Sequence, residues 1–201
     1  IHVPRMPATM FKGKSALGYR GDAILEMDWV VGRITEKLEE LGLTKNTIII
    51  FSSDNGPVLD DGYADDAVAL NGNHKPSGPY RGGKTAIFEG GTRVPFIVKW
   101  PGQIKPGTSN ALVNQIDFTA SFAKLLNIGI KAGEAKDSED HLDALLGKSK
   151  TGRTSMVEEG YFDTAIVANQ WKYIPATEKR KAMLFNLKND EGEKNNIIDQ
   201  H

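Results

Sequence analysis

The chain has 201 residues, of which 39% are hydrophobic and 25% are charged, and its formal net charge is −1. This composition is typical of one globular domain, or of one domain with a small appendage, and it excludes global disorder. The near-neutral charge gives no electrostatic reason to expect nucleic acid or an anionic membrane as a partner. No apolar run is long enough to span a bilayer. The absence of Cys excludes disulfides, thiolate metal ligands and a cysteine nucleophile within these residues.

The first regular element that we expect is a long amphipathic helix. Residues 2–18 contain Pro and Gly at short spacing and are typical of a loop. Asp22 is then expected to cap a helix that runs to about Leu41, because apolar residues recur there at gaps of three and four. Gly42 follows as the residue that ends the helix. The apolar stripe, which we expect to face a core, consists of Ile24, Met27, Val31, Ile34, Leu38 and Leu41.

Two strand-like segments flank a long irregular region. Thr47–Ser53 contains four consecutive large apolar residues, which is typical of a strand buried on both faces of a parallel sheet. A helix followed by such a strand is half of a βαβ unit, so the predicted fold class is α/β. A second strand is expected at Val94–Trp100. The intervening residues, 54–91, are rich in Gly, Pro, Asp and Asn, and a loop of this length in a compact domain is usually functional or disordered.

The C-terminal part is expected to be built from smaller elements. A helix is predicted from Asp117 to Leu126 with its large apolar side chains turned inward, residues 131–140 are expected to be a polar surface excursion, and residues 141–146 a short helix or turn. The residues after 155 predict a small antiparallel sheet. Its strands are expected at Ser155–Glu158, Thr164–Ala168, Lys172–Ile174 and Met183–Asn186. We therefore divide the chain into a larger part, residues 1–150, and a small C-terminal subdomain, residues 151–201.

The clearest candidate metal site follows the first strand. Asp54 and Asn55 stand at the carboxyl end of that strand, where ligands collect in open α/β sheets. Their side chains offer a carboxylate and an amide oxygen, which are ligands that Ca²⁺ and Mg²⁺ prefer, and Gly56 lets the backbone turn away. Taken alone, the tripeptide is more typical of a strand-ending Asx turn without a metal.

Other polar residues of the loops could contact an anion. Lys84 follows two glycines that allow a close approach, although the phosphate-loop spacing is absent and an exposed Lys beside a turn is the simpler interpretation. His2 and His74 could act as general acids or bind an anion when protonated, or be ordinary solvated side chains. For Glu89 and Arg93, a structural ion pair that orients the loop is favoured over substrate contact.

Taken in their order along the chain, these motifs resemble the sulfatase family of the alkaline-phosphatase-like fold. The matching segments are His2-Val3-Pro4, the helix that opens at Gly21-Asp22, Ser52 to Gly56, Gly82-Gly83-Lys84, Phe88 to Pro95, Trp100-Pro101-Gly102 and Leu184 to Glu193. The ordered set covers nearly the whole chain and is far more specific than any member of it. The resemblance implies an α/β fold in which part of a mixed sheet is flanked by helices, with a small antiparallel sheet at the C-terminal end.

The resemblance also implies a chemistry. In this family a Cys within Cys-x-Pro-Ser-Arg is converted to formylglycine, whose hydrated aldehyde attacks the sulfur of a sulfate ester beside a Ca²⁺ ion. Carried over to this chain, Asp54 and Asn55 would be Ca²⁺ ligands, Lys84 would bind the sulfate, and His2 would bind the sulfate or protonate the leaving oxygen. A cation and an ammonium group suit this reaction because negative charge spreads over the sulfate oxygens.

The loop before Lys84 bears on the substrate. His74 and Arg81, together with Lys75 and Tyr80, are expected either to line a pocket for an anionic or sulfated sugar or to belong to an ordinary solvated loop. The family resemblance further implies a periplasmic or secreted location.

The chain also departs from the family pattern, because it has no Cys and so no formylglycine. Its opening, Ile1-His2-Val3-Pro4, does not resemble a natural start, so we expect the C-terminal part of a longer enzyme, inactive alone and at best a weak Ca²⁺ binder. The unpaired edge of Thr47–Ser53 would then invite association. Two alternatives remain: a phosphomonoester or phosphodiester hydrolase of the same fold, which would typically need further Asp and His ligands, and a non-catalytic glycan-binding or structural module.

Overall fold

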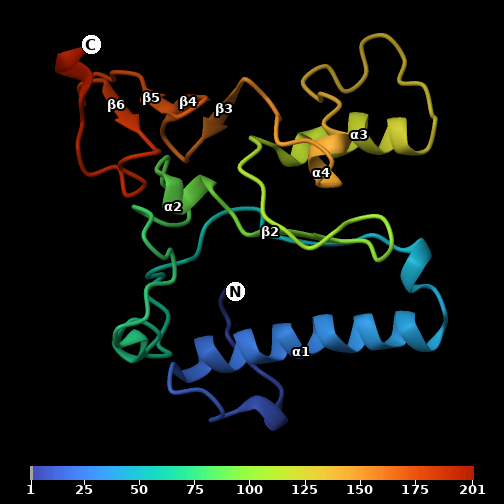
Figure 1. Cartoon of the computed structure of the whole chain (residues 1–201). Helices are drawn as coiled ribbons and strands as arrows, with labels where there is room; N and C mark the ends of the chain where they lie inside the picture. Colours follow the sequence, from blue (N-terminus) through green and yellow to red (C-terminus); the bar gives the residue numbers. More distant parts are fainter. Residues whose placement is uncertain (1) are drawn as a thin grey trace.

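The computed structural model describes residues 2–201 and shows a mixed α/β architecture (Figure 1). The helices are α1 (Gly18–Glu40), α2 (Glu89–Thr92), α3 (Phe118–Leu125) and α4 (Leu142–Leu145). The strands are β1 (Ile49–Ser52), β2 (Phe96–Lys99), β3 (Ser155–Glu159), β4 (Thr164–Ala168), β5 (Trp171–Ile174) and β6 (Met183–Asn186). Within residues 2–201, none of the helices combines the length and the apolarity that crossing a membrane requires.

The long helix α1 begins earlier than predicted, and Asp22 does not cap it. Asp22 lies inside the helix and is buried. Its carboxylate accepts hydrogen bonds from the backbone N–H groups of Gly13 and Ser15, both at 2.8 Å. The prediction of a cap was wrong because the carboxylate satisfies the backbone of the loop before the helix rather than the first turn of the helix itself.

The apolar stripe of α1 is only partly covered in this chain. Ile34 is 53% exposed and Leu41 is 60% exposed, whereas the other four predicted members are half-buried. Gly42 follows the helix with φ +66° and donates its N–H to the carbonyl of Glu39, which confirms its predicted role as the terminating residue.

The strands β1 and β2 pair antiparallel, with Ile49 opposite Lys99 and Ser52 opposite Phe96. The parallel pairing expected for the first strand is therefore not found among the described residues, and β1 is half-buried rather than buried on both faces. A run of apolar residues indicates a strand but not the direction of its neighbour. Phe96 stacks on Phe118 of α3 with ring centroids 5.8 Å apart, so the strand pair lies between α1 and α3 (Figure 1).

The four C-terminal strands form the small antiparallel sheet that the sequence predicts, in the order β3-β4-β5-β6. Its core contains Ala165, Ile174 and Phe185 from the sheet together with Ile87. Because Ile87 stands just before α2, the apolar core of the sheet reaches the loop that contains Lys84. The division of the chain at residue 150 is not tested by this packing and stays a prediction.

The helix α3 has the predicted position, but two of its details differ from the prediction. Leu126 is exposed rather than turned inward. Asp117 makes no side-chain cap to α3. Its buried carboxylate instead accepts the backbone N–H of Asn114 and of Glu139, each at 3.0 Å, and pairs with Arg153 at 2.6 Å. The burial of Asp117 is thus offset by an arginine and two amides from distant parts of the chain.

Candidate functional site

The segment that follows β1 runs beside the loop that contains Lys84. The N–H of Gly56 donates to the carbonyl of Gly91, and the N–H of Lys84 donates to the carbonyl of Pro57, both at 2.8 Å. These two backbone hydrogen bonds join the Asp54 segment to the Lys84 segment, although about 30 residues of loop separate them in sequence.

Two glycines make this close approach possible. A Cβ on Gly56 would lie 1.8 Å from the carbonyl oxygen of Gly90, and a Cβ on Gly83 would lie 2.6 Å from that of Pro57. Any side chain at either position would therefore push the two segments apart. The glycines that the sequence places beside Asp54-Asn55 and Lys84 are needed for the junction itself.

Asp54 and Asn55 present oxygen atoms that other groups of the described chain leave free. Asp54 is exposed, and its carboxylate makes no hydrogen bond within residues 2–201. Asn55 is half-buried and donates through Nδ2 to the carbonyl of Gly56 at 2.9 Å, which leaves Oδ1 available. A carboxylate and an amide oxygen suit a hard cation. No group of three or more His, Cys, Asp or Glu that could hold a metal occurs in the described residues, so this pair supplies only part of a shell.

Gln115 braces the strand end that carries this pair, and the sequence analysis missed it. Its Nε2 donates to the carbonyl of Ser53 at 2.7 Å and to Oγ of Ser52 at 2.9 Å. Gln115 opens a short 3₁₀ turn fixed by a reciprocal capping box between Asn114 and Asp117. The Asn-x-x-Asp spacing could have indicated this turn, but not the contact across 62 residues.

Lys84 is held in place through its backbone. Its side chain is half-buried and has no carboxylate within 4 Å among the described residues, so the ammonium group is available to an anion. The next residue, Thr85, has φ +75°, a conformation that a β-branched residue adopts only when its surroundings impose it. The Thr85 carbonyl accepts the N–H of Tyr161 at 2.9 Å, so the hairpin between β3 and β4 helps to fix the Lys84 loop.

The side chains of the remaining predicted site residues have partners other than Lys84, or none among the described residues. His2 is exposed, and its Nδ1 accepts the N–H of Val3 at 2.9 Å; His74 is also exposed. Arg81 places its guanidinium 3.7 Å from the ring centroid of Phe88 and donates to the carbonyl of Glu193 at 3.1 Å. No contact of the described residues brings these side chains to Lys84, and their predicted roles in catalysis and substrate binding stay predictions.

A buried charge cluster fixes the helix α2 just beyond Lys84. The ammonium group of Lys172 is completely buried and lies 2.7 Å from Glu158, 3.0 Å from Glu89 and 3.6 Å from Glu193. The carboxylate of Glu193 also accepts the backbone N–H of Glu89 at 2.6 Å. The predicted ion pair between Glu89 and Arg93 is confirmed at 3.2 Å. The cluster therefore ties α2 to both the sheet and the C-terminal loop.

Burial and charge act in opposite directions within this cluster. Burial disfavours the charge of Lys172, but its three carboxylate neighbours outweigh burial and raise its pKa above the ordinary value. Burial raises the pKa of Glu193 to about 7 despite the nearby ammonium group. The sequence held one signal for this arrangement, since Lys172 shares a face of its strand with the core residue Ile174.

Comparisons with known proteins identify the family of the chain. A family model described as Sulfatase matches residues 2–128, and one described as N-sulphoglucosamine sulphohydrolase, C-terminal, matches residues 82–201. The chain is 49% identical over 216 residues to an N-acetylgalactosamine-6-O-sulfatase of Bacteroides thetaiotaomicron, a match that covers all of this chain and 42% of that protein.

Solved structures give the same picture of the fold. A structure from work on glycosaminoglycan metabolism by Bacteroides thetaiotaomicron matches with a TM-score of 0.95 and 47% identity, over all of this chain and 45% of the other. A phosphonate monoester hydrolase from Silicibacter pomeroyi matches with a TM-score of 0.61 and 20% identity, over 89% of this chain and 36% of the other, and shows the fold alone. The chain thus spans less than half the length of these relatives.

The fold class predicted from the sequence, α/β of the alkaline-phosphatase-like kind with a small C-terminal antiparallel sheet, is confirmed by these neighbours. The Sulfatase model covers more than half of the chain, and the motifs that carry the resemblance all lie within the matched regions. The chain belongs to the sulfatase family.

Proposed function

We propose that the protein to which this chain belongs hydrolyses sulfate esters of a sulfated carbohydrate, with the help of Ca²⁺ and a formylglycine. The observation that carries the proposal is the junction of the two loops. In it, the N–H of Lys84 donates a hydrogen bond to the carbonyl of Pro57, and the N–H of Gly56 donates one to the carbonyl of Gly91. This junction fixes the backbone of the Lys84 segment against the segment of Asp54 and Asn55, which supports a site that uses a lysine together with hard oxygen ligands. The relative named as an N-acetylgalactosamine-6-O-sulfatase supports a sulfated sugar as the substrate.

Asp54 and Asn55 fit a Ca²⁺ ion because their free oxygens are of the type that calcium binds. When bound, the ion would supply positive charge that stabilises the oxygens of the reacting sulfate group. Gln115 would keep these ligands in position through its two hydrogen bonds to the end of β1. Further carboxylate ligands would come from outside the described residues, because these contain no group of three or more His, Cys, Asp or Glu that could hold a metal.

Lys84 and His2 would act on the sulfate ester itself. The Lys84 ammonium group would bind sulfate oxygens and offset the negative charge that they gather in the transition state. His2, when protonated, would bind the sulfate or donate a proton to the leaving oxygen, which otherwise departs as an alkoxide. The formylglycine would come from a residue outside this chain, which has no Cys. We therefore expect no turnover from the 201 residues alone.

The test uses the longer protein that contains this chain and its nucleophile. We expect it to release sulfate from 6-O-sulfated N-acetylgalactosamine and from a small aryl sulfate, and to lose this activity when Ca²⁺ is chelated. Lys84→Ala should lower kcat at least 100-fold on both substrates, because it removes a charge that stabilises the transition state. Sulfate release is measured by ion chromatography.

Lys105→Ala is the control, since Lys105 is an exposed lysine outside the loops of the candidate site. An equal loss in both variants would contradict the role of Lys84. Faster hydrolysis of an aryl phosphate than of the aryl sulfate would favour the phosphoesterase alternative, and absence of turnover on every ester would favour the non-catalytic module.

A further inference from the structure

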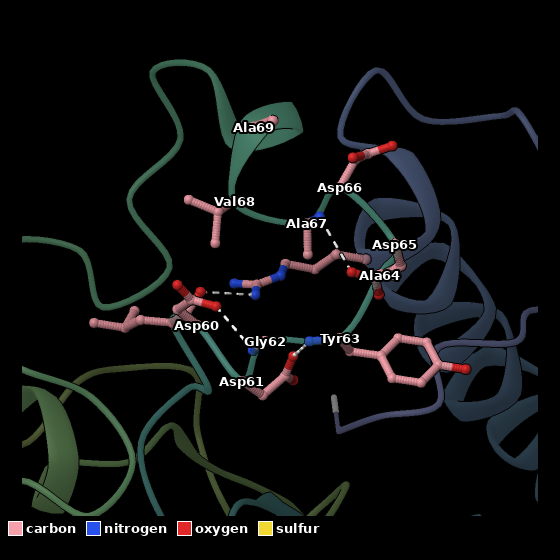
Figure 2. Close-up of a pocket in the computed structure, with 12 residues that line it drawn as sticks. Asp60, Asp61, Gly62, Tyr63, Ala64, Asp65, Asp66, Ala67, Val68 and Ala69 are labelled. Carbon is pink, nitrogen blue, oxygen red and sulfur yellow. Dashed lines mark hydrogen bonds between the residues drawn. The ribbon is translucent and has the colours of Figure 1, made fainter.

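A pocket of about 280 Å³ lies between the start of α1 and the loop that follows the candidate metal site (Figure 2). Its wall is formed by the Leu59–Ala69 segment, which curves around it, and by the side chain of Arg20. A pocket of this size is at the low end of those that hold small molecules. None of the residues assigned above to the sulfate ester belongs to it.

Arg20 is the unusual member of this pocket. Its side chain is buried, with 4% of the residue exposed, yet it has no carboxylate within 4 Å among the described residues. Nη2 donates to the carbonyl of Leu59 at 3.1 Å, whereas the buried Nε has no partner there. Burial and the nearby charge of Arg5 lower its pKa. A buried guanidinium with unused donors is costly unless something in the pocket accepts its hydrogen bonds.

The other charges decide what that acceptor can be. The guanidinium of Arg5 already forms ion pairs with Asp61 at 2.8 Å and with Asp65 at 2.6 Å. Asp60 lies on the same loop, and one of its carboxylate oxygens accepts the N–H of Gly62 at 2.9 Å, which leaves the other oxygen without a partner in the described chain. Four aspartates line the pocket, namely Asp60, Asp61, Asp65 and Asp66. They outnumber the two arginines, Arg20 in the lining and Arg5 paired with Asp61 and Asp65. This excess of acidic groups disfavours an anionic ligand. A cation is also disfavoured, because it would be repelled by the buried guanidinium and would leave its unused donors without an acceptor.

The contacts of the loop place the pocket beside the candidate reaction centre. A Cβ on Gly83 would lie 2.7 Å from Cγ of Leu59, so the pocket wall packs directly against the residue before Lys84. Arg5, three residues after His2, fastens the N-terminal segment to the same loop through its two ion pairs. The pocket is thus bordered by the segments that carry His2 and Lys84.

We propose that this pocket is a subsite for an uncharged sugar ring adjoining the ring that bears the sulfate ester. Arg20 donates to hydroxyl oxygens of that ring, and the free carboxylate oxygen of Asp60 accepts a hydroxyl hydrogen. A neutral polyol satisfies both groups without adding charge, which neither an anion nor a cation does. The proposal rests on the proposed function and deepens it, because it assigns the neighbouring sugar a recognition site and makes Arg20 and Asp60 specificity residues.

The test compares three substrates in the full-length enzyme: a sulfated disaccharide whose second ring is uncharged, the sulfated monosaccharide and a small aryl sulfate. Arg20→Lys keeps the charge but loses the fork of donors, and Asp60→Asn removes the acceptor charge. Each variant should lower kcat/KM about tenfold for the disaccharide, through KM, and leave the other two substrates within about twofold. Arg33→Lys and Asp28→Asn are the controls, since both residues are exposed on α1 outside the pocket.

An equal loss on all three substrates, or no loss on the disaccharide, would overturn the proposal. If Arg20→Lys does not fold, Asp60→Asn decides alone, because Asp60 is exposed. Calorimetric binding of the desulfated disaccharide separates this proposal from the proposed function. Suppose that the wild-type protein hydrolyses no sulfate ester but binds the disaccharide, and that Asp60→Asn does not bind it. This result would refute the sulfatase activity and support the proposed pocket. A disaccharide with a uronate as its second ring should bind more weakly than the neutral one, and tighter binding would contradict the charge argument.

Discussion

The two sides of the candidate site are held in different ways. On the Lys84 side, α2 is bound by the Lys172 cluster and by the apolar core of the C-terminal sheet, with Ile174 and Phe185 almost fully buried. On the pocket side, α1 leaves Ile34 and Leu41 of its apolar stripe exposed, and the ion pairs of Arg5 fasten the loop. If Lys84 and the pocket have the roles proposed above, the lysine of catalysis stands on a support held by buried side chains, and the loop that recognises the substrate is held by polar contacts.

Removing the cation of the C-terminal cluster should have the largest effect on stability. Lys172→Met leaves Glu89, Glu158 and Glu193 buried together without their partner, which should lower the free energy of unfolding by about 3–5 kcal/mol. Denaturant unfolding measures the loss. Lys188→Met, at an exposed lysine after β6, is the control and should change the free energy by less than about 0.5 kcal/mol. A loss no greater than that of the control would show that the cluster does not hold the Lys84 side.

Titration of Glu193 should make the same side sensitive to pH. Its pKa is about 7 in the folded protein against 4.5 in the unfolded chain, so the folded state holds the proton more tightly. Protonation of Glu193 contributes at most about 3 kcal/mol to the free energy of unfolding. This contribution is complete below about pH 4.5 and is lost as the pH rises through about 7. Glu193→Gln should remove this pH dependence, as measured by unfolding at pH 5 and pH 8. Glu191→Gln, at an exposed neighbour, should keep it.

The clamp on the pocket side should be weaker. Arg5→Met leaves the buried Asp65 without its cation and should cost about 1–3 kcal/mol, less than Lys172→Met. Arg33→Met breaks only the exposed ion pair with Glu36 and should cost about 0.5 kcal/mol or less. If Arg5→Met proved more damaging than Lys172→Met in the same unfolding experiment, the comparison between the two sides would be reversed.

The smallest effect is expected at the loop before α1. Asp22→Asn keeps the size of the side chain but weakens the two hydrogen bonds from Gly13 and Ser15, at a cost of about 1 kcal/mol. Hydrogen exchange of those two amides should quicken, because their acceptor loses its charge. Asp28→Asn, at an exposed position on the same helix, should leave both amides unchanged.

The sequence predicted local features well and distant contacts poorly. The four C-terminal strands and the short helix α4 appeared where their alternation and turn residues indicated. Asp22 and Asp117 were both expected to cap helices, and both instead bond backbone groups that lie up to 22 residues away. The antiparallel direction of β1 and β2 was missed for the same reason, since pairing partners are set by the tertiary fold.

The candidate site shows the same limit. The order of motifs identified Asp54, Asn55 and Lys84, and the structure joins their segments through Gly56 and Pro57. Arg20 drew no attention because nothing in the sequence around it distinguishes a buried arginine from an exposed one on a helix. Its significance comes from burial without an ion pair, which only the packing of the loop against α1 reveals.

The hydrogen bond between Lys84 and Pro57 has a consequence for how relatives could differ. It closes the intervening residues into an excursion whose two ends meet, so the excursion can change length or composition while its base stays fixed. The segments that contain Asp54 and Lys84 adjoin that base, and the pocket wall lies within the excursion. If the pocket binds a sugar ring as proposed, related chains can change their sugar preference by substitutions in this one stretch, without altering Asp54, Asn55 or Lys84.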